Sequence, residues 1–205
     1  IAVKIKKKKN LHLLFYVLMI DSDGSSIFGK TTIMNEMNLK GLYDGNFYHV
    51  CTNGLEQVTL LKDEEDFKTA WNYIALIAWH IGVEVVAFIL MSNHMHQILA
   101  CKDILQADAA IKLYKKMLSL YLKNKYGLKK VLHRTDDCIS LIDTATYMKN
   151  CIAYILRNAV CARICAKPED YRWSSYACYF SDARSEKSFL VSELTFSQKR
   201  KMLRT

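Results

Sequence analysis

The sequence predicts an α+β fold in which helices cover an antiparallel β-sheet. The main observation is the order of segments: β-prone segments come in pairs, and each pair is followed by a segment with helical periodicity. Gly and Pro number only 7 and 1 among 205 residues, and 51% of the residues are hydrophobic. This composition excludes a disordered or linker-rich chain and supplies enough apolar surface for one domain.

The first strand pair and the first helix are predicted early in the folded region. Residues 47–51 are β-prone, a turn begins at Thr52, and residues 55–61 form a second extended segment. Asp63 is placed to cap a helix whose first turn is acidic, the sign that this end of the helix dipole favours. Apolar residues then recur at helical spacing until Gly82, where the helix is expected to end.

The second strand pair is predicted to be a hairpin. Residues 83–90 form a near-continuous β-prone run, which is typical of a strand buried on both faces, and we expect it at the centre of the sheet. A break at Ser92 and Asn93 separates this run from residues 94–100, its expected hairpin partner.

Two further helices complete the predicted fold. One covers residues 107–126 and ends at Gly127, and the other covers 144–161 with Asp143 as its cap. The expected core stripe of the first of these helices consists of five residues, namely Ala110, Leu113, Met117, Leu120 and Tyr121.

The charge of the chain favours an anionic partner, because 29 basic and 20 acidic residues give a net charge of +9. Between residues 109 and 135 there are eight basic residues and no acidic one. Tyrosines and a histidine are interleaved there and offer surfaces on which unpaired bases could stack, namely Tyr114, Tyr121, Tyr126 and His133. The candidate nucleic-acid contacts in this region are Lys112, Lys115, Lys116, Lys123 and Arg134. The alternative is an ordinary solvated helix face.

The cysteines and the N-terminus bear on the compartment of the protein. The seven cysteines are odd in number and contain no CxxC pair, so we expect reduced thiols and a cytoplasmic protein. Lysines at 6–9 precede an apolar run at 11–20, which is the outline of a signal peptide. The run has no small-residue cleavage pattern and is too short to span a bilayer, so an extension or an added edge strand is the alternative. We expect no membrane partner.

His94 and His96 are the sharpest candidates for chemistry. They begin an apolar strand, and residues two apart on a strand project from the same face. Two imidazoles side by side suit a divalent cation, although they could equally be hydrogen-bonded histidines at a strand edge.

Tyr154 and Asn158 are the second candidate pair. They lie four residues apart in the last predicted helix, so both side chains are expected on one helix face. If that face meets the histidines, Asn158 could give the cation an oxygen ligand and Tyr154 could attack a bound phosphate. The alternative is a tyrosine at the edge of the core, since the chain has 12 tyrosines.

Four segments in order resemble the single-tyrosine HUH transposases, and most closely the REP-associated tyrosine transposases. VVAFILMSNHMHQIL at 85–99 resembles the family's LMxNHxH signature, and YHVCTNG at 48–54 resembles its first strand and turn. YILRNAV at 154–160 resembles the YIxxNPV helix, and PEDYRWSSY at 168–176 resembles the PExYxWSSY tail. Two departures are Ala159 in place of the usual Pro and a poor match at 132–138.

The resemblance implies a ferredoxin-like antiparallel sheet flanked by helices, the HUH endonuclease fold. It implies an N-terminal extension at 1–45, a catalytic domain at 46–180 and a C-terminal tail at 181–205. It also implies that His94, His96 and Asn158 bind Mg²⁺ or Mn²⁺ and that Tyr154 is the nucleophile.

The function implied is cleavage and rejoining of single-stranded or hairpin DNA through a 5′-phosphotyrosine intermediate. The alternative is a catalytically silent nucleic-acid-binding protein of the same fold. A zinc hydrolase is disfavoured because no acidic third ligand follows at a suitable helical spacing. The sequence leaves open whether the protein is a monomer or a homodimer.

Overall fold

The computed structural model describes residues 45–52, 59–128, 132 and 137–176. The predicted N-terminal extension, except for residue 45, and the predicted C-terminal tail therefore lie outside the described residues. In chain order the elements are β1 (Asn46–Thr52), α2 (Glu64–Ile81), β2 (Glu84–Leu90), β3 (Met95–Cys101), α3 (Ile104–Tyr126), β4 (Asp137–Ile142), α4 (Ala145–Cys161) and a 3-10 turn, η3 (Pro168–Asp170).

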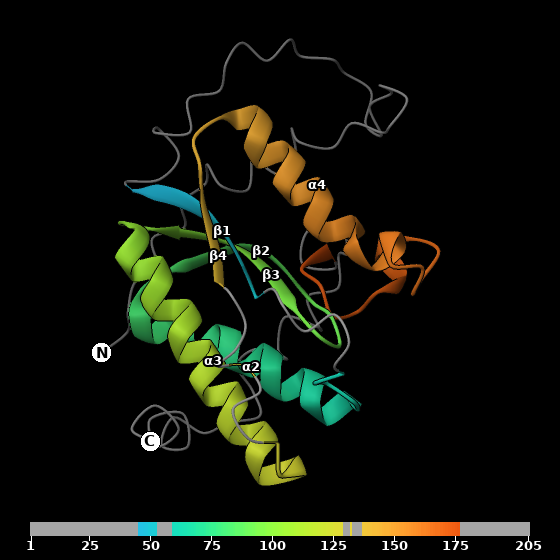
Figure 1. Cartoon of the computed structure of the whole chain (residues 1–205). Coiled ribbons are helices and arrows are strands. Elements are labelled where there is room, and N and C mark those ends of the chain that lie inside the picture. Colours follow the sequence, from blue (N-terminus) through green and yellow to red (C-terminus); the bar gives the residue numbers. More distant parts are fainter. Residues whose placement is uncertain (1–44, 53–58, 129–131, 133–136, 177–205) are drawn as a thin grey trace, which may run out of the picture.

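The four strands form one antiparallel sheet in the order β2-β3-β1-β4. Helices α2 and α3 cover one face of the sheet and α4 covers the other (Figure 1). The first six elements alternate as βαββαβ, with both helices on the same face, which is the ferredoxin-like arrangement. The predicted α+β fold class, with a ferredoxin-like sheet flanked by helices, is confirmed.

Local signals set the helix ends. Asp63 caps α2 through a capping box with Asp66, and Gly82 ends the helix with a φ of 80°. Helix α3 begins earlier than predicted, because Asp103 accepts a hydrogen bond from the backbone N–H of Gln106.

The cap of α4 is Thr144, where Asp143 was predicted. The Thr144 hydroxyl oxygen accepts a hydrogen bond from the backbone N–H of Tyr147 at 3.1 Å. Asp and Thr are both common N-cap residues, so residue type alone could not decide between positions 143 and 144.

Strand β2 was predicted to be central, and this was wrong, because it is the outer strand beside β3. It is nevertheless buried, because helices cover both of its faces and the chain after η3 covers its edge. Leu90 N donates to Trp173 O at 2.9 Å, and Ser175 N donates to Phe88 O at 2.9 Å. A continuous apolar run indicates that both faces of a strand are buried, but it does not determine the position of the strand in the sheet. An outer strand whose edge is covered can have the same run.

Two predictions of strands differ from the structure. Of the predicted extended segment at 55–61, only residues 59–61 are described, and they are not in a strand. Conversely, β4 was not predicted. Its sequence, DCISLI, has polar and apolar residues on each face and so lacks the alternation that predicts a strand. Such a mixture is compatible with an edge strand that is partly exposed.

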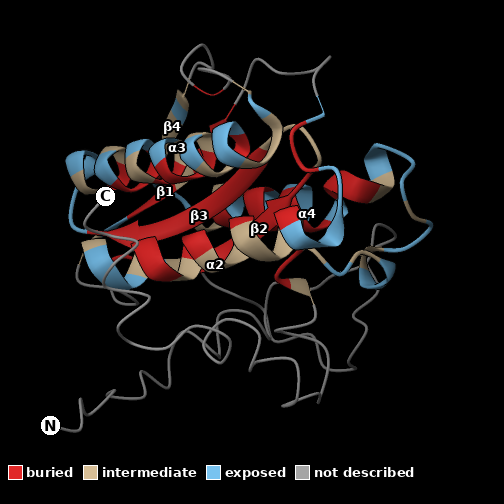
Figure 2. Ribbon diagram, turned by 90° about the horizontal axis from the view of Figure 1, so that it is seen from below, coloured by how far each residue is buried: buried red, intermediate tan, exposed pale blue. Residues whose placement is uncertain are grey.

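Two hydrophobic cores lie on either side of the sheet. One lies between the sheet and α2 and α3, and the other lies between the sheet and α4. Figure 2 shows β1, β2 and β3 largely buried between helices whose outer faces are exposed, whereas β4 is partly exposed. The core stripe predicted for α3 was partly wrong, because Leu120 is 43% exposed. The residues of α3 that are buried are Ala107, Ala110, Ile111, Tyr114, Met117, Leu118 and Leu122.

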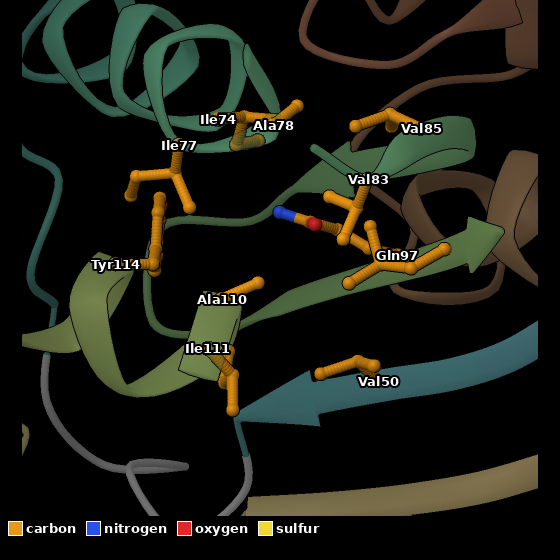
Figure 3. Close-up of a pocket in the computed structure, with 11 residues that line it drawn as sticks. Val50, Ile74, Ile77, Ala78, Val83, Val85, Gln97, Ala110, Ile111 and Tyr114 are labelled. Atoms are coloured by element: carbon orange, nitrogen blue, oxygen red, sulfur yellow. The ribbon is translucent and has the colours of Figure 1, made fainter. Parts of the chain in front are cut away.

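A cavity of about 10 Å³ lies between α2, α3 and the sheet, and Gln97 is among the residues that line it (Figure 3). This volume is about that of one water molecule, and most of the lining is aliphatic. The cavity is therefore a packing gap in the first core. Within the described part of the chain, no helix is long and apolar enough to cross a membrane.

Candidate active site

His94 and His96 lie where the β2–β3 hairpin closes. The backbone N–H of Met91 donates to His94 O at 2.9 Å, which sets the turn, and β3 begins at the next residue. The two imidazole rings have their centroids 5.0 Å apart. His96 is 5% exposed, whereas His94 is half-buried at the rim.

Helix α4 brings Tyr154 to these histidines. The helix packs its apolar side on the sheet, and Tyr154 lies at the edge of that side with 50% of its surface exposed. Its hydroxyl oxygen is 3.5 Å from His96 Nε2, and the two rings meet edge to face at 5.1 Å. A phenol at this position is accessible from solvent and also touches His96.

Asn158 follows Tyr154 by one helical turn and is 8% exposed. An amide is costly to bury, so its placement in the sheet-facing half of α4 needs a polar partner or a ligand. Because the two residues are four apart in the helix, Asn158 and Tyr154 lie on nearly the same side of α4.

A third histidine, His49 of β1, joins the cluster. Its Nε2 lies 3.2 Å from His96 Nδ1, and the two rings stack with centroids 5.3 Å apart. His49 also meets the ring of Tyr154 edge to face at 6.3 Å. Sequence reasoning assigned no role to His49, although a histidine on the same face of β1 as Phe47 and Cys51 was the available signal.

Burial keeps His49 and His96 neutral. Burial lowers the pKa of His49. The pKa of His96 falls to about 3, mainly because of burial and secondarily because of repulsion from His94 and His49. Neutral imidazoles have a lone pair, which a metal ion requires.

The donor set suits a cation that keeps other oxygen ligands. Among the residues that the structure describes, no three His, Cys, Asp or Glu side chains are arranged to hold a metal ion. His94 and His96 could supply two nitrogens, and Asn158, one helical turn after Tyr154, is the candidate oxygen donor on α4. Mn²⁺ accepts imidazole, and Mg²⁺ commonly retains waters and phosphate oxygens, so both are compatible with this set.

The other described tyrosines near α4 have structural contacts. Tyr147 is half-buried, and burial raises its pKa. The Tyr171 hydroxyl donates to Leu90 O at 2.6 Å, and the Tyr176 hydroxyl donates to Glu169 at 3.1 Å. Tyr171 thus anchors this segment against the edge of β2. Tyr179 lies outside the described residues.

The structure does not bring the basic helix to the histidines and Tyr154. Helix α3 lies on one face of the sheet and α4 on the other (Figure 1). Lys112 pairs with Asp108 at 2.7 Å and Lys115 pairs with Asp137 at 2.8 Å. Lys116 and Lys123 are exposed, and Arg134 lies outside the described residues.

The expected stacking tyrosines of α3 are not on an open surface. Tyr114 is 3% exposed and belongs to the core. The hydroxyls of Tyr121 and Tyr126 both donate to Asp66, at 2.7 and 2.8 Å. The prediction that Tyr114 stacks on bases was therefore wrong, because its side chain is buried in the core. His133 lies outside the described residues.

Comparison with known proteins gives a structural relationship. No protein-family model matches the chain, and no curated protein matches its sequence. Among solved structures, the chain is similar to a REP-associated tyrosine transposase bound to a REP hairpin. The TM-score is 0.51 at 14% identity, over 73% of this chain and 84% of the other. This likeness supports the fold.

Proposed function

We propose that this chain is a metal-dependent single-stranded DNA endonuclease and strand-transfer enzyme, a transposase that acts through a 5′-phosphotyrosine intermediate. The observation that carries the proposal is the approach of the Tyr154 hydroxyl to His96, at 3.5 Å, on the face of the sheet that α4 covers. A half-exposed phenol beside two neutral imidazoles is suited to attack on a phosphodiester.

The proposed reaction is a transesterification. Tyr154 Oη attacks phosphorus and loses its proton to solvent, the P–O3′ bond breaks, and the 3′ oxygen takes a proton from solvent and leaves as a hydroxyl. A bound Mg²⁺ or Mn²⁺ would polarise the phosphate and offset the charge that develops on the leaving oxygen. His94, His96 and Asn158 would hold that ion. Because the phosphotyrosine ester keeps the bond energy, a second 3′-hydroxyl can attack it and join strands without ATP.

The proposed partner is single-stranded or hairpin DNA. The net charge of +9 favours a polyanion, and the structurally similar transposase was solved with a hairpin bound. Lys116 and Lys123 are two exposed lysines of α3 that would contact phosphates.

The test is covalent trapping of the DNA. A pool of hairpin-forming single strands labelled at the 3′ end is incubated with the protein and Mn²⁺, and the products are separated on a denaturing gel. We expect a labelled protein–DNA adduct that peptide mapping places on Tyr154. Tyr154→Phe should abolish the adduct, whereas the matched variant Tyr147→Phe, two turns away on the same helix, should retain it.

Two outcomes would contradict the proposal. Repeated cutting without any adduct, in Mg²⁺ or Mn²⁺, would exclude the phosphotyrosine mechanism. Binding of the pool without cutting, unchanged in Tyr154→Phe, would identify the silent nucleic-acid-binding protein instead.

A further inference from the structure

The two ring nitrogens of His96 lie in different surroundings. Nδ1 is 3.2 Å from His49 Nε2, and Nε2 is 3.5 Å from the hydroxyl of Tyr154. The ring is 5% exposed, so Nδ1 depends on His49 for a hydrogen bond. His49 thus lies on the side of His96 that faces away from Tyr154.

Strand pairing produces this contact. In the β1–β3 register, Cys51 lies opposite His96 and His49 lies opposite Ile98. His49 and His96 are therefore diagonal neighbours on the same face of the sheet, within reach of long side chains. The rings stack with an interplanar angle of 19°, which fixes the plane of the His96 ring as well as its position.

A neutral imidazole donates from one nitrogen and accepts at the other, so the contact between His49 and His96 has two forms. If His96 accepts at Nδ1, its proton is on Nε2, and that nitrogen has no lone pair for a cation. If His96 donates from Nδ1 to His49 Nε2, its lone pair is on Nε2, on the side of Tyr154. Histidines that bind metals usually donate their second N–H to a neighbouring acceptor.

His94 shows the same arrangement with another acceptor. Its Nδ1 lies 2.7 Å from Asn93 Oδ1. An amide oxygen only accepts, so Nδ1 of His94 carries the proton and the lone pair is on Nε2. If His96 donates from Nδ1 to His49, the two histidines of the HxH pair have the same tautomer through different neighbours.

We propose that His49 is a positioning residue, which holds His96 in the tautomer with its proton on Nδ1 and its lone pair on Nε2. The inference rests on the proposed function, in which His96 is a metal ligand. His49 itself touches neither the ion nor the DNA. Because its Nε2 accepts in this arrangement, the neutral His49 ring carries its own proton on Nδ1.

The first arm of the test is a direct measurement of the tautomer. Long-range ¹H–¹⁵N NMR of the imidazoles is recorded on the metal-free full chain at a pH of about 8, above the usual pKa of histidine. We expect the Nδ1–H form for His96 in the wild type. In His49→Phe we expect the Nε2–H form or a mixture, and in His49→Gln, whose amide oxygen can accept, the Nδ1–H form again.

The second arm is the affinity for Mn²⁺ alone, measured by the EPR signal of the free ion. We expect His49→Phe to weaken binding about 10- to 100-fold, the usual effect of losing such a partner. His49→Gln should restore affinity to within a few-fold of the wild type. His80→Phe, which removes an exposed histidine from α2 on the other face of the sheet, should have no effect.

The outcomes separate this inference from the proposed function. An Nε2–H tautomer in the wild type, or no change of tautomer in His49→Phe, overturns the role of His49 even if Tyr154 forms the DNA adduct. Equal losses of Mn²⁺ affinity in the Phe and Gln variants, with the His96 tautomer intact in both, would make His49 a ligand and overturn the inference. Absence of Mn²⁺ binding by the wild type contradicts the metal requirement, whereas the tautomer in the metal-free chain still decides the role of His49.

Discussion

His94 is the residue of the HxH pair that is best suited to mutation, because it is half-buried at the rim whereas His96 is 5% exposed in the core. We expect His94→Ala to reduce cleavage of single-stranded DNA by a factor on the order of 100 or more, the size usual for losing one group that stabilises developing charge. DNA affinity should change little, because the proposed phosphate contacts are lysines of α3. Single-turnover cleavage and filter binding measure the two quantities.

His80→Ala is the control, since it removes an exposed histidine from α2. Addition of EDTA to the wild type should reproduce the loss of cleavage. Wild-type cleavage that persists in EDTA would contradict the role of the histidines as metal ligands.

At the scale of elements, the sheet lies between α3 and α4. The proposed DNA contacts of α3 and the proposed catalytic residues of α4 can therefore be tested separately. We expect the double variant Lys116→Gln, Lys123→Gln to weaken binding of single strands. The slope of log affinity against log salt should fall by about 0.7 for each phosphate that the variant no longer neutralises. Cleavage at saturating DNA should be unchanged, because neither lysine lies on the face with Tyr154.

Lys112→Gln is the matched control on the same helix. Lys112 is paired with Asp108, so its removal should change the slope less. A slope that is equal in the double variant and the wild type would mean that DNA does not follow α3.

The edge of β2 is covered by the segment that follows η3, and Tyr171 holds that segment through its hydrogen bond to Leu90 O. We expect Tyr171→Phe to destabilise the protein by about 1 kcal/mol, because Leu90 O loses its donor. Hydrogen exchange at the amide of Leu90, which donates to Trp173 O, should accelerate. Urea unfolding and exchange NMR measure these effects.

Tyr176→Phe serves as the comparison, because the Tyr176 hydroxyl donates to an exposed carboxylate of Glu169. Its stability should change by less than that of Tyr171→Phe. Equal effects in the two variants would show that the hydrogen bond to Leu90 does not hold the edge.

For the whole molecule, one buried carboxylate joins α2 to α3. Asp66 is inaccessible to solvent and accepts hydrogen bonds from Lys125, Tyr121 and Tyr126. Burial by itself opposes the charge of Asp66, but the hydrogen bonds from Lys125, from the Lys62 N–H and from the tyrosines outweigh it. The pKa of Asp66 is therefore lowered to about 2.

A carboxyl group whose pKa is lower in the folded state stabilises the fold above its unfolded pKa and loses that effect as the pH falls. We expect the free energy of unfolding to decrease by about 2 kcal/mol through Asp66 alone between pH about 4 and pH about 2. Urea unfolding at several pH values measures the decrease.

Lys125→Met tests the same junction by leaving the Asp66 carboxylate buried without its cation. We expect a larger loss of stability at neutral pH than for Tyr171→Phe, because removal of one partner leaves a buried charge uncompensated. The free energy of unfolding should also depend less steeply on pH between about 4 and about 2, because the pKa of Asp66 rises. Lys123→Met, which removes an exposed lysine from the same turn of α3, should change the free energy of unfolding little.

The sequence by itself determined the elements whose signals lie within a few residues. The capping box at Asp63, the glycine stops at Gly82 and Gly127, and the alternation that puts His94 beside His96 are all local. Each depends on backbone hydrogen bonds or side-chain directions that span no more than about four residues. The same locality explains why the helix that carries Tyr154 and Asn158 could be predicted with both residues on one side.

Only the tertiary structure decided which of these elements are neighbours. His49 meets His96 because β1 pairs with β3 across 47 residues of chain, and the weakly patterned β4 exists as a strand because β1 offers it an edge. The outer position of β2, and the separation of the lysines of α3 from Tyr154 by the sheet, have the same origin. The order of the strands and the face of the sheet that each helix covers are decided together, because both hydrophobic cores must be buried at once. No local spacing in the sequence contains that information.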